Sequence, residues 1–132
     1  MASRHFDLVV IGGGPAGYVG AIRAAQLGLN VACVERAKLG GVCLNWGCIP
    51  SKALLSNAEL MEKLHKADFW GLKLQGTVGI DWDKVLGRSR DVANKLNKGI
   101  EFLFKKNKIT HIVGNAKITS ARMGGAGGKC TV

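Results

Sequence analysis

The amino-acid sequence predicts an α/β fold in which short parallel strands form a sheet that helices cover. Residues 6–11 and 30–34 are short, β-branched apolar runs, as expected for strands buried on both faces of a parallel sheet. A glycine-rich turn and an alanine-rich stretch connect them, so that strand, helix and strand form a βαβ unit. With 132 residues and 47% hydrophobic content, the chain can bury one core.

The first helix is predicted over residues 15–27, directly after the glycine turn. Pro15 suits the first turn of a helix, where its missing N–H removes no hydrogen bond. The alanine-rich sequence favours a helix, and Gly28 provides a C-terminal stop. The second strand then ends at Glu35, and residues 36–47 are expected to form a loop.

Two further helices and a third strand are predicted in the rest of the chain. One helix starts at Pro50, and residues 69–79 are irregular. Asp81 is the expected N-cap of a long amphipathic helix, and residues 109–113 form the third strand. Residues 117–119 begin a fourth strand. The apolar side of the long helix carries Trp82, Val85, Leu86, Val92, Leu96, Ile100, Leu103 and Phe104.

The last stretch, residues 122–132, is rich in glycine and has no periodicity, so we expect neither a strand nor a helix there. The predicted organisation is therefore a domain of residues 1–121 followed by an irregular tail of residues 122–132. The sheet would lack a strand beside its first one, and such an open edge favours aggregation.

The chain has a formal net charge of +10 at pH 7. Eight lysines and arginines lie between Lys84 and Lys108, against the two acids Asp91 and Glu101. A solvated helix face explains this segment, and a surface that attracts nucleic acid, an acidic partner or anionic lipid is the alternative. Loss of acidic regions by truncation is a third explanation of the net charge. No nucleic-acid fold signature appears, so nucleic acid is not an expected partner. Arg23 interrupts the longest apolar stretch, and we expect a soluble cytoplasmic protein with no membrane span.

The glycine turn between the first strand and the first helix predicts a dinucleotide site. Gly12 permits the tight turn, Gly14 lets a pyrophosphate approach the backbone, and Gly17 lets the helix lie close to the strand. The helix N-terminus favours the phosphates. Glu35, at the end of the second strand, is placed to accept hydrogen bonds from ribose hydroxyls and disfavours a 2′-phosphate by charge repulsion. The turn alone does not distinguish FAD from NAD.

Four cysteines occur, and Cys43 and Cys48 form one close pair. A structural zinc site needs four ligands, so we expect no metal. A structural disulfide remains possible, and a loop this short would contribute on the order of 2 kcal/mol. If the two are linked, the start of the following helix must be distorted, and strain makes a disulfide easier to reduce. A cysteine at a helix N-terminus also has a stabilised thiolate. The strained bond and the stabilised thiolate together favour redox catalysis.

The segment Gly-Gly-Val-Cys-Leu-Asn-Trp-Gly-Cys-Ile-Pro-Ser-Lys, residues 40–52, closely resembles the active-site signature of the class I pyridine nucleotide–disulfide oxidoreductases. Leu44, Trp46 and the Ala-Leu-Leu continuation at residues 53–55 make it most similar to the dihydrolipoamide-oxidising branch of that family. Mercuric and glutathione reductase types are the alternatives within it. The resemblance covers residues 5 to about 120 and implies a Rossmann-like FAD-binding domain with a parallel sheet, incomplete at its C-terminal end.

The resemblance assigns roles to individual residues. Cys43 would exchange with the dihydrolipoyl group, Cys48 would lie beside the flavin, and Lys52 would lie near the reactive edge of the flavin ring. Ala116 falls where the family commonly has glycine and where the backbone contacts adenine. The implied cofactor-binding set is Gly12, Gly14, Pro15, Gly17, Glu35, Arg36, Gly41, Val42, Cys43, Lys52 and Ala116, and the implied catalytic pair is Cys43 and Cys48.

The family's activity passes electrons from a dithiol to the disulfide, then to FAD and then to NAD. Its partners are the dihydrolipoyl groups of 2-oxo acid dehydrogenase complexes or of the glycine cleavage carrier protein, and its members are homodimers. The NAD and dimerisation domains are absent here, and His5, His65 and His111 do not match the family's catalytic histidine. We therefore expect an inactive fragment when the chain is alone. A non-catalytic flavin- or ADP-binding module and a basic nucleic-acid scaffold are the competing hypotheses.

Overall fold

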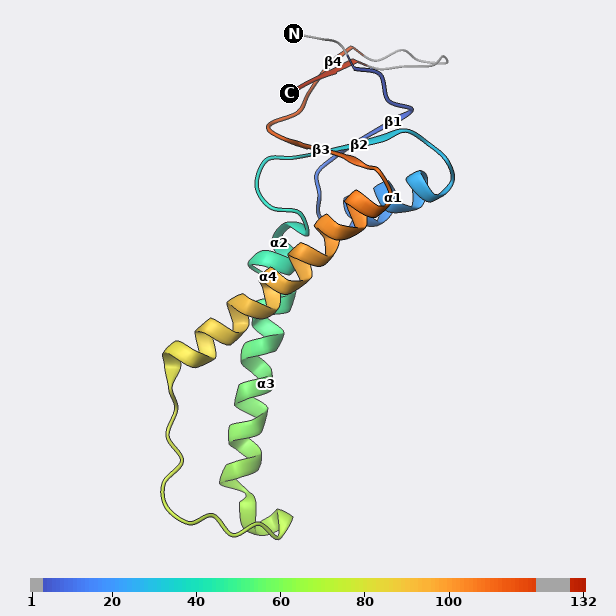
Figure 1. Cartoon of the computed structure of the whole chain (residues 1–132). Helices are drawn as coiled ribbons and strands as arrows, with labels where there is room; N and C mark the ends of the chain where they lie inside the picture. Colours follow the sequence, from blue (N-terminus) through green and yellow to red (C-terminus); the bar gives the residue numbers. More distant parts are fainter. Residues whose placement is uncertain (1–3, 121–128) are drawn as a thin grey trace. The chain divides into compact units, whose positions relative to one another are not determined.

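The computed structural model describes residues 4–120 and 129–132, and the chain forms two compact units (Figure 1). The sheet unit consists of Met1–Gly41 and Asn97–Val132, and the helical unit consists of Val42–Leu96. The long helix α4 (Trp82–Lys106) contributes residues to both units.

The sheet unit contains the predicted βαβ unit and a third strand. β1 (Leu8–Ile11) leads through α1 (Pro15–Gln26) to β2 (Val31–Glu35), and β3 (Thr110–Val113) returns after α4. The sheet has the order β1-β2-β3, and both neighbouring pairs are parallel. The predicted α/β class with a parallel sheet is confirmed.

Helices of the sheet unit lie on one face of this sheet. Parallel pairing sets Val10 of β1 and His111 of β3 on either side of Cys33, so the three share a face. α1 lies against Val10. The ring of Phe104 in α4 meets His111 edge to face, with ring centroids 6.2 Å apart. The C-terminal part of α4 therefore covers the same face as α1.

The first two strands differ in burial, and the prediction for the first strand was wrong. β2 is buried on both faces from Val31 to Val34, as a central parallel strand should be. β1 instead alternates, with Val9 38% and Ile11 51% exposed. The cause is its position, because β1 lies at an edge of the sheet within the described part of the chain. Within the described residues, the sheet therefore has the predicted open edge beside β1.

The predicted irregular tail also needs correction. Lys129–Thr131 forms β5, which pairs antiparallel with β4 (Lys117–Ser120) in a separate two-stranded sheet. Backbone pairing requires an available partner strand and does not require side-chain periodicity. β5 could therefore not be predicted from the pattern of its side chains. The predicted fourth strand thus exists, but it lies outside the parallel sheet. Residues 122–128 of the predicted tail lie outside the described residues.

The helical unit begins with a short helix where a loop was predicted. α2 (Gly41–Asn45) occupies part of residues 36–47, and α3 (Cys48–His65) starts two residues before the predicted Pro50. A short 3-10 helix, η1 (Ala67–Trp70), follows α3. Five-residue helices leave little periodicity in a sequence, so α2 was missed.

α4 begins as predicted, but its buried face is narrower than expected. The Asp81 carboxylate accepts a hydrogen bond from the Lys84 N–H at 3.1 Å, which is the expected N-cap contact. Of the eight apolar residues assigned to one side, only Ile100 and Phe104 are buried, and Trp82 is largely exposed. The other buried positions are polar or small: Ser89, Ala93 and Asn97.

Two arginines of this basic segment donate hydrogen bonds to backbone carbonyls inside the helical unit. Arg88 donates to the backbone carbonyl of Ala53 at 3.0 Å, and Arg90 donates to that of Asn45 at 3.2 Å. These bonds satisfy carbonyl oxygens with charged donors and account for part of the basic character of α4. Among the described residues, no helix is both long enough and apolar enough to cross a bilayer.

Candidate functional site

The glycine turn of the sheet unit has the backbone geometry that its sequence predicted. Gly12 has a φ of +98°, a left-handed conformation, and its N–H donates to the Val34 carbonyl at 2.8 Å. Gly14 is the N-cap of α1, and Pro15 occupies the first position of the helix. A Cβ on Gly17 would overlap the carbonyl oxygen of Gly12, so only glycine lets α1 lie this close to β1.

Glu35 is tied directly to this turn. Its Oε2 accepts the Gly13 N–H at 2.8 Å, and its Oε1 accepts the Ala37 N–H at 2.8 Å. Burial acts to raise the pKa of Glu35, but hydrogen bonds from Ala37, Gly13 and Arg36 and the Arg36 charge lower that pKa overall. The carboxylate is therefore held in its charged form beside the turn. Each oxygen keeps a further lone pair for a hydroxyl donor.

A second segment, residues 39–41, lies against the glycine turn. The Gly40 N–H donates to the Gly13 carbonyl at 2.7 Å. Gly41 has a φ of +58°, and a Cβ there would stand 2.8 Å from the Gly14 Cα. A Cβ on Gly13 would stand 2.7 Å from Cδ2 of the buried Leu39. The two backbones approach closely because glycines occupy both sides.

Sequence reasoning missed Gly13, Leu39, Gly40 and the buried Asn97 at this site. The side-chain amide of Asn97, in α4, donates to the Leu39 carbonyl. The two glycines could have been suspected from the run of three glycines at residues 12–14 and the pair at residues 40–41. Asn97 carries no comparable signal, because its partner is 58 residues away.

The remaining predicted cofactor residues of the sheet unit are less constrained. Arg36 is exposed, and its charge acts on the neighbouring Glu35. Ala116 is half-buried in the segment between β3 and β4. The sheet unit therefore holds Gly12, Gly14, Pro15, Gly17, Glu35, Arg36, Gly41 and Ala116, whereas Val42, Cys43, Cys48 and Lys52 belong to the helical unit.

The cysteine pair lies at the junction of α2 and α3 in the helical unit. Cys43 is in α2, Cys48 is the first residue of α3, and both are free thiols in this structure. Gly47 joins the helices, and a Cβ there would stand 3.1 Å from the Val42 carbonyl oxygen. A link between the two cysteines was expected to need a distorted helix start, and the structure has a break there between α2 and α3.

The two thiols interact with each other. A hydrogen bond to the Cys48 side chain, followed by burial and the Cys48 charge, raises the pKa of Cys43 above its ordinary value. The Cys48 backbone N–H and the charge of Lys52 act in the opposite direction. In the dithiol form, the neighbouring Cys48 thus makes the Cys43 thiol harder to deprotonate than an isolated cysteine.

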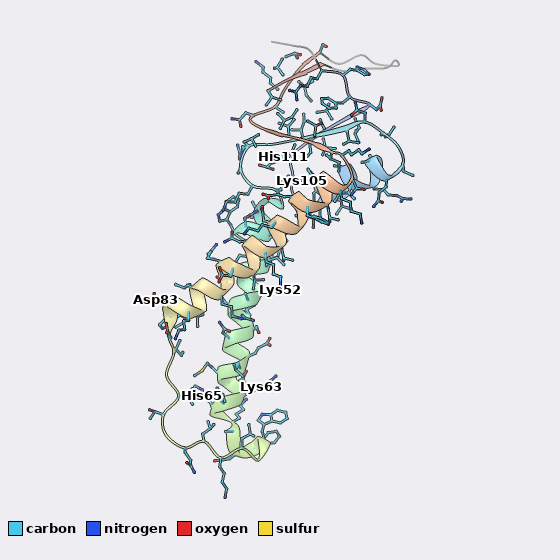
Figure 2. All side chains as sticks on the ribbon, in the orientation of Figure 1. Lys52, Lys63, His65, Asp83, Lys105 and His111 are labelled. Carbon is cyan, nitrogen blue, oxygen red and sulfur yellow. The ribbon has the colours of Figure 1, made fainter. Side chains whose placement is uncertain are left out.

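The other titratable residues highlighted by the sequence are distributed over both units. Lys52 and His65 project from α3, and His111 belongs to β3 (Figure 2). Cys33 is fully buried in β2, and burial together with the Glu35 charge raises the pKa of its thiol to about 11. Cys33 is consequently inert compared with the pair. Within the described residues, no cluster of side chains could hold a metal ion.

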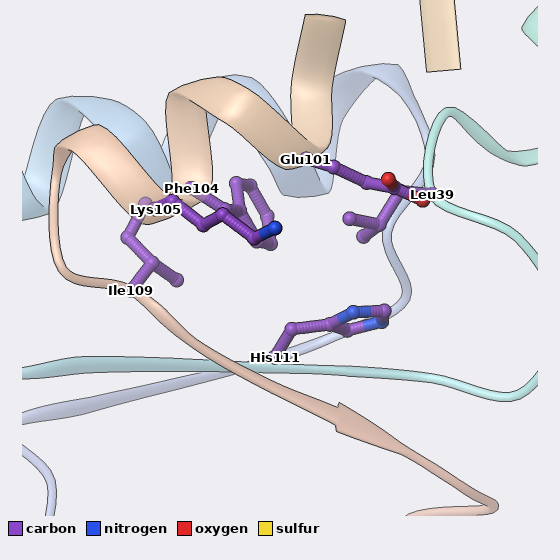
Figure 3. A pocket seen from close by; sticks show the side chains of 6 residues that line it. All are labelled: Leu39, Glu101, Phe104, Lys105, Ile109 and His111. Atoms are coloured by element: carbon purple, nitrogen blue, oxygen red, sulfur yellow. The ribbon is translucent and has the colours of Figure 1, made fainter. Parts of the chain in front are cut away.

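A small cavity in the sheet unit is lined in part by Leu39 (Figure 3). Its volume is about 160 Å³, and apolar groups of Leu39, Phe104 and Ile109 share the lining with Glu101, Lys105 and His111. The cavity thus adjoins the segment that contacts the glycine turn.

Comparison with known proteins places the chain in a family. The model of the pyridine nucleotide-disulphide oxidoreductase family matches residues 6–131, which is nearly the whole chain. The chain belongs to the pyridine nucleotide-disulphide oxidoreductase family. The family resemblance of the cysteine segment and of the glycine turn is therefore confirmed.

Curated relatives within this oxidoreductase family are closely similar in sequence. The dihydrolipoyl dehydrogenase of Rhizobium etli is 55% identical over 117 residues, covering 89% of this chain and 24% of the relative. That of Zymomonas mobilis is 53% identical over 115 residues, covering 87% of this chain and 24% of the relative. The chain thus spans about a quarter of the length of these relatives.

A solved structure shares the fold. The crystal structure of LpdA from Mycobacterium tuberculosis matches with a TM-score of 0.76 and 24% identity, covering 86% of this chain and 24% of that one. This likeness supports the Rossmann-like arrangement of the oxidoreductase family in the present chain.

Proposed function

We propose that this chain provides the FAD-binding and dithiol part of a dihydrolipoyl dehydrogenase. The observation that carries the proposal is the dithiol of Cys43 and Cys48, two interacting sulfurs at a helix start, in a chain 55% identical to a dihydrolipoyl dehydrogenase. The glycine turn and Glu35 support binding of the ADP part of FAD. The dihydrolipoyl branch is favoured over the mercuric and glutathione reductase types by the names of these relatives.

The residues of the sheet unit fit a dinucleotide. Gly12 has open space where a side chain would otherwise stand, and the N-cap of α1 presents backbone donors that suit a diphosphate. Glu35 is charged and has lone pairs for the two ribose hydroxyls, and the same charge disfavours a 2′-phosphate. FAD, when bound, would supply a two-electron acceptor, with NAD as the final acceptor of the whole enzyme.

The cysteine pair would carry out thiol–disulfide exchange. In the oxidised protein, a thiolate of the dihydrolipoyl group attacks the Cys43 sulfur, and the Cys43–Cys48 bond breaks. The second substrate sulfur then closes the lipoyl disulfide and releases Cys43. The substrate loses two electrons and two protons, and the two cysteines become the dithiol seen in the structure. Lys52 has a charge that lowers the pKa of Cys43 and so favours its release as a thiolate.

The partners of the complete enzyme follow from the same proposal. They are the dihydrolipoyl groups of a 2-oxo acid dehydrogenase complex or of the glycine cleavage carrier protein, together with a second copy in a homodimer.

Reduction of the oxidised chain by dihydrolipoamide tests the exchange step. The chain is oxidised, freed of oxidant, treated with dihydrolipoamide and alkylated, and the labelled cysteines are identified by mass spectrometry. We expect Cys43 and Cys48 to become labelled together, and the Cys33→Ala variant to behave like the parent chain. Cys43→Ser and Cys48→Ser should form no internal disulfide. An oxidised pair that dihydrolipoamide leaves intact would disprove the proposed activity.

A further inference from the structure

We infer that Asn97 is a positioning residue for the phosphate-binding backbone of the glycine turn, acting through residues 39 and 40. This inference rests on the proposed dinucleotide function. Asn97 lies on the inner face of α4 and is only 8% exposed. A buried amide with a directed hydrogen bond needs a partner in a fixed place, and that partner is the Leu39 carbonyl.

The first link is a single peptide group held at both ends. The Leu39 carbonyl and the Gly40 N–H belong to one peptide unit, which is planar and turns as a rigid body. Asn97 donates to its carbonyl, and its N–H donates to the Gly13 carbonyl at 2.7 Å. Gly40 has a φ of +89°, which a side chain would resist, so glycine permits this orientation. The hydrogen bond from Asn97 in α4 thus fixes the orientation of the Leu39–Gly40 peptide group, whose N–H contacts the Gly13 carbonyl.

The second link is the peptide group between Gly13 and Gly14. Its carbonyl accepts the Gly40 N–H, and planarity then sets the direction of the Gly14 N–H on the opposite side. Gly14 is the N-cap of α1, where the helix leaves backbone donors outside its own ladder. Glu35 holds the Gly13 N–H at 2.8 Å, so the turn is fixed on both sides of Gly13.

These bonds form a relay that ends at the Gly14 N–H, the donor that we assign to a bound diphosphate. It runs from the Asn97 amide to the Leu39–Gly40 peptide, then to the Gly13–Gly14 peptide. Each hydrogen bond in such a series polarises the next, which strengthens the Gly14 N–H as a donor to an anion. Asn97 therefore affects diphosphate binding without touching the nucleotide.

Two measurements on the full chain test this inference. Hydrogen exchange reports the Gly40 amide in the ligand-free protein, and calorimetry reports the dissociation constant of ADP. For Asn97→Leu we expect Gly40 exchange to accelerate and ADP binding to weaken, each by about fivefold, the size of one lost hydrogen bond. Exchange at the β2 amides should change much less. Asn94→Leu, at an exposed position of the same helix, should behave like the parent chain.

The outcomes separate this inference from the proposed function. A parent chain that binds no ADP refutes the proposed function, whereas unchanged Gly40 exchange in Asn97→Leu overturns the relay whatever ADP does. Faster Gly40 exchange with unchanged ADP affinity would show that the relay does not affect phosphate binding. Equal acceleration of amide exchange throughout β2 would show that Asn97 has only a structural role. If Asn97→Leu does not fold, Asn97→Asp keeps the side-chain shape, lacks the amide donor and is held to the same criteria.

Discussion

Glycines that look alike in the sequence differ in what a side chain would meet. In α1, a Cβ on Gly17 would overlap the backbone of Gly12, whereas a Cβ on Gly20 would meet nothing within 4 Å. The missing side chain of Gly17 therefore allows α1 to pack closely against β1. Gly20 permits no such contact and only adds conformational freedom to the unfolded chain.

This contrast predicts opposite effects of the same substitution. Gly17→Ala should destabilise the chain by about 3 kcal/mol, because α1 must move away from β1. Gly20→Ala should stabilise it by about 0.5–1 kcal/mol, because alanine favours the helix. Urea unfolding followed by circular dichroism measures both values. Equal effects of the two substitutions would show that the close contact between Gly17 and Gly12 is not present.

The cysteine pair gives a prediction for pH dependence. In Cys48→Ala, the thiol hydrogen bond and the charge that raise the pKa of Cys43 are removed, while the residue-48 backbone N–H and Lys52 remain. The pKa of Cys43 should fall, so its thiolate forms at lower pH than in the parent dithiol. The pH dependence of Cys43 alkylation measures this shift. An unchanged or higher midpoint would refute the interaction between the two sulfurs.

Among the secondary-structure elements, α4 has a start and a helical character that the sequence predicts, but its buried residues could not be predicted. Its start at Asp81 follows from capping chemistry, and its amphipathic pattern identifies it as a helix. The pattern did not reveal which apolar residues are buried. Leu86, Leu96 and Leu103 remain substantially exposed although they lie on the apolar side, whereas Asn97 is buried. Burial depends on which neighbours the helix meets, and a single periodic pattern contains no such information.

Two phenylalanines of α4 offer a matched test of this burial. Phe104 is 2% exposed and packs against the sheet, whereas Phe102 is 64% exposed. Phe104→Ala should cost about 3–5 kcal/mol of unfolding free energy. Phe102→Ala should change it by no more than about 0.5 kcal/mol. Chemical denaturation of the two variants distinguishes them, and comparable losses would contradict the placement of α4 on the sheet.

At the scale of the whole molecule, the parts predicted best are those with strong local signals. The βαβ unit follows from two β-branched runs and a glycine turn, and the cysteine segment is recognisable by itself. α2 is too short for periodicity, and β5 depends on a partner strand rather than on its own side chains. The contact of residues 39–41 with the glycine turn was missed because it joins backbone groups 27 residues apart, Gly13 and Gly40.

The charge of Glu35 connects the fold to nucleotide choice. The turn, the end of β2 and residues 39–41 meet in one unit, and the carboxylate at their centre is held ionised by backbone donors. An ionised carboxylate accepts ribose hydroxyls and repels a phosphate at the same place. The sheet unit should therefore select an ADP group with an unmodified ribose.

Calorimetric titration of the chain with ADP and with 2′-phosphorylated ADP measures whether the sheet unit selects an unmodified ribose. We expect ADP to bind, and the 2′-phosphorylated form to bind at least about tenfold more weakly because of charge repulsion at Glu35. Glu35→Gln should reduce that difference. Failure of ADP to bind, or equal binding of the two nucleotides, would show that Glu35 and the glycine turn do not select such a group.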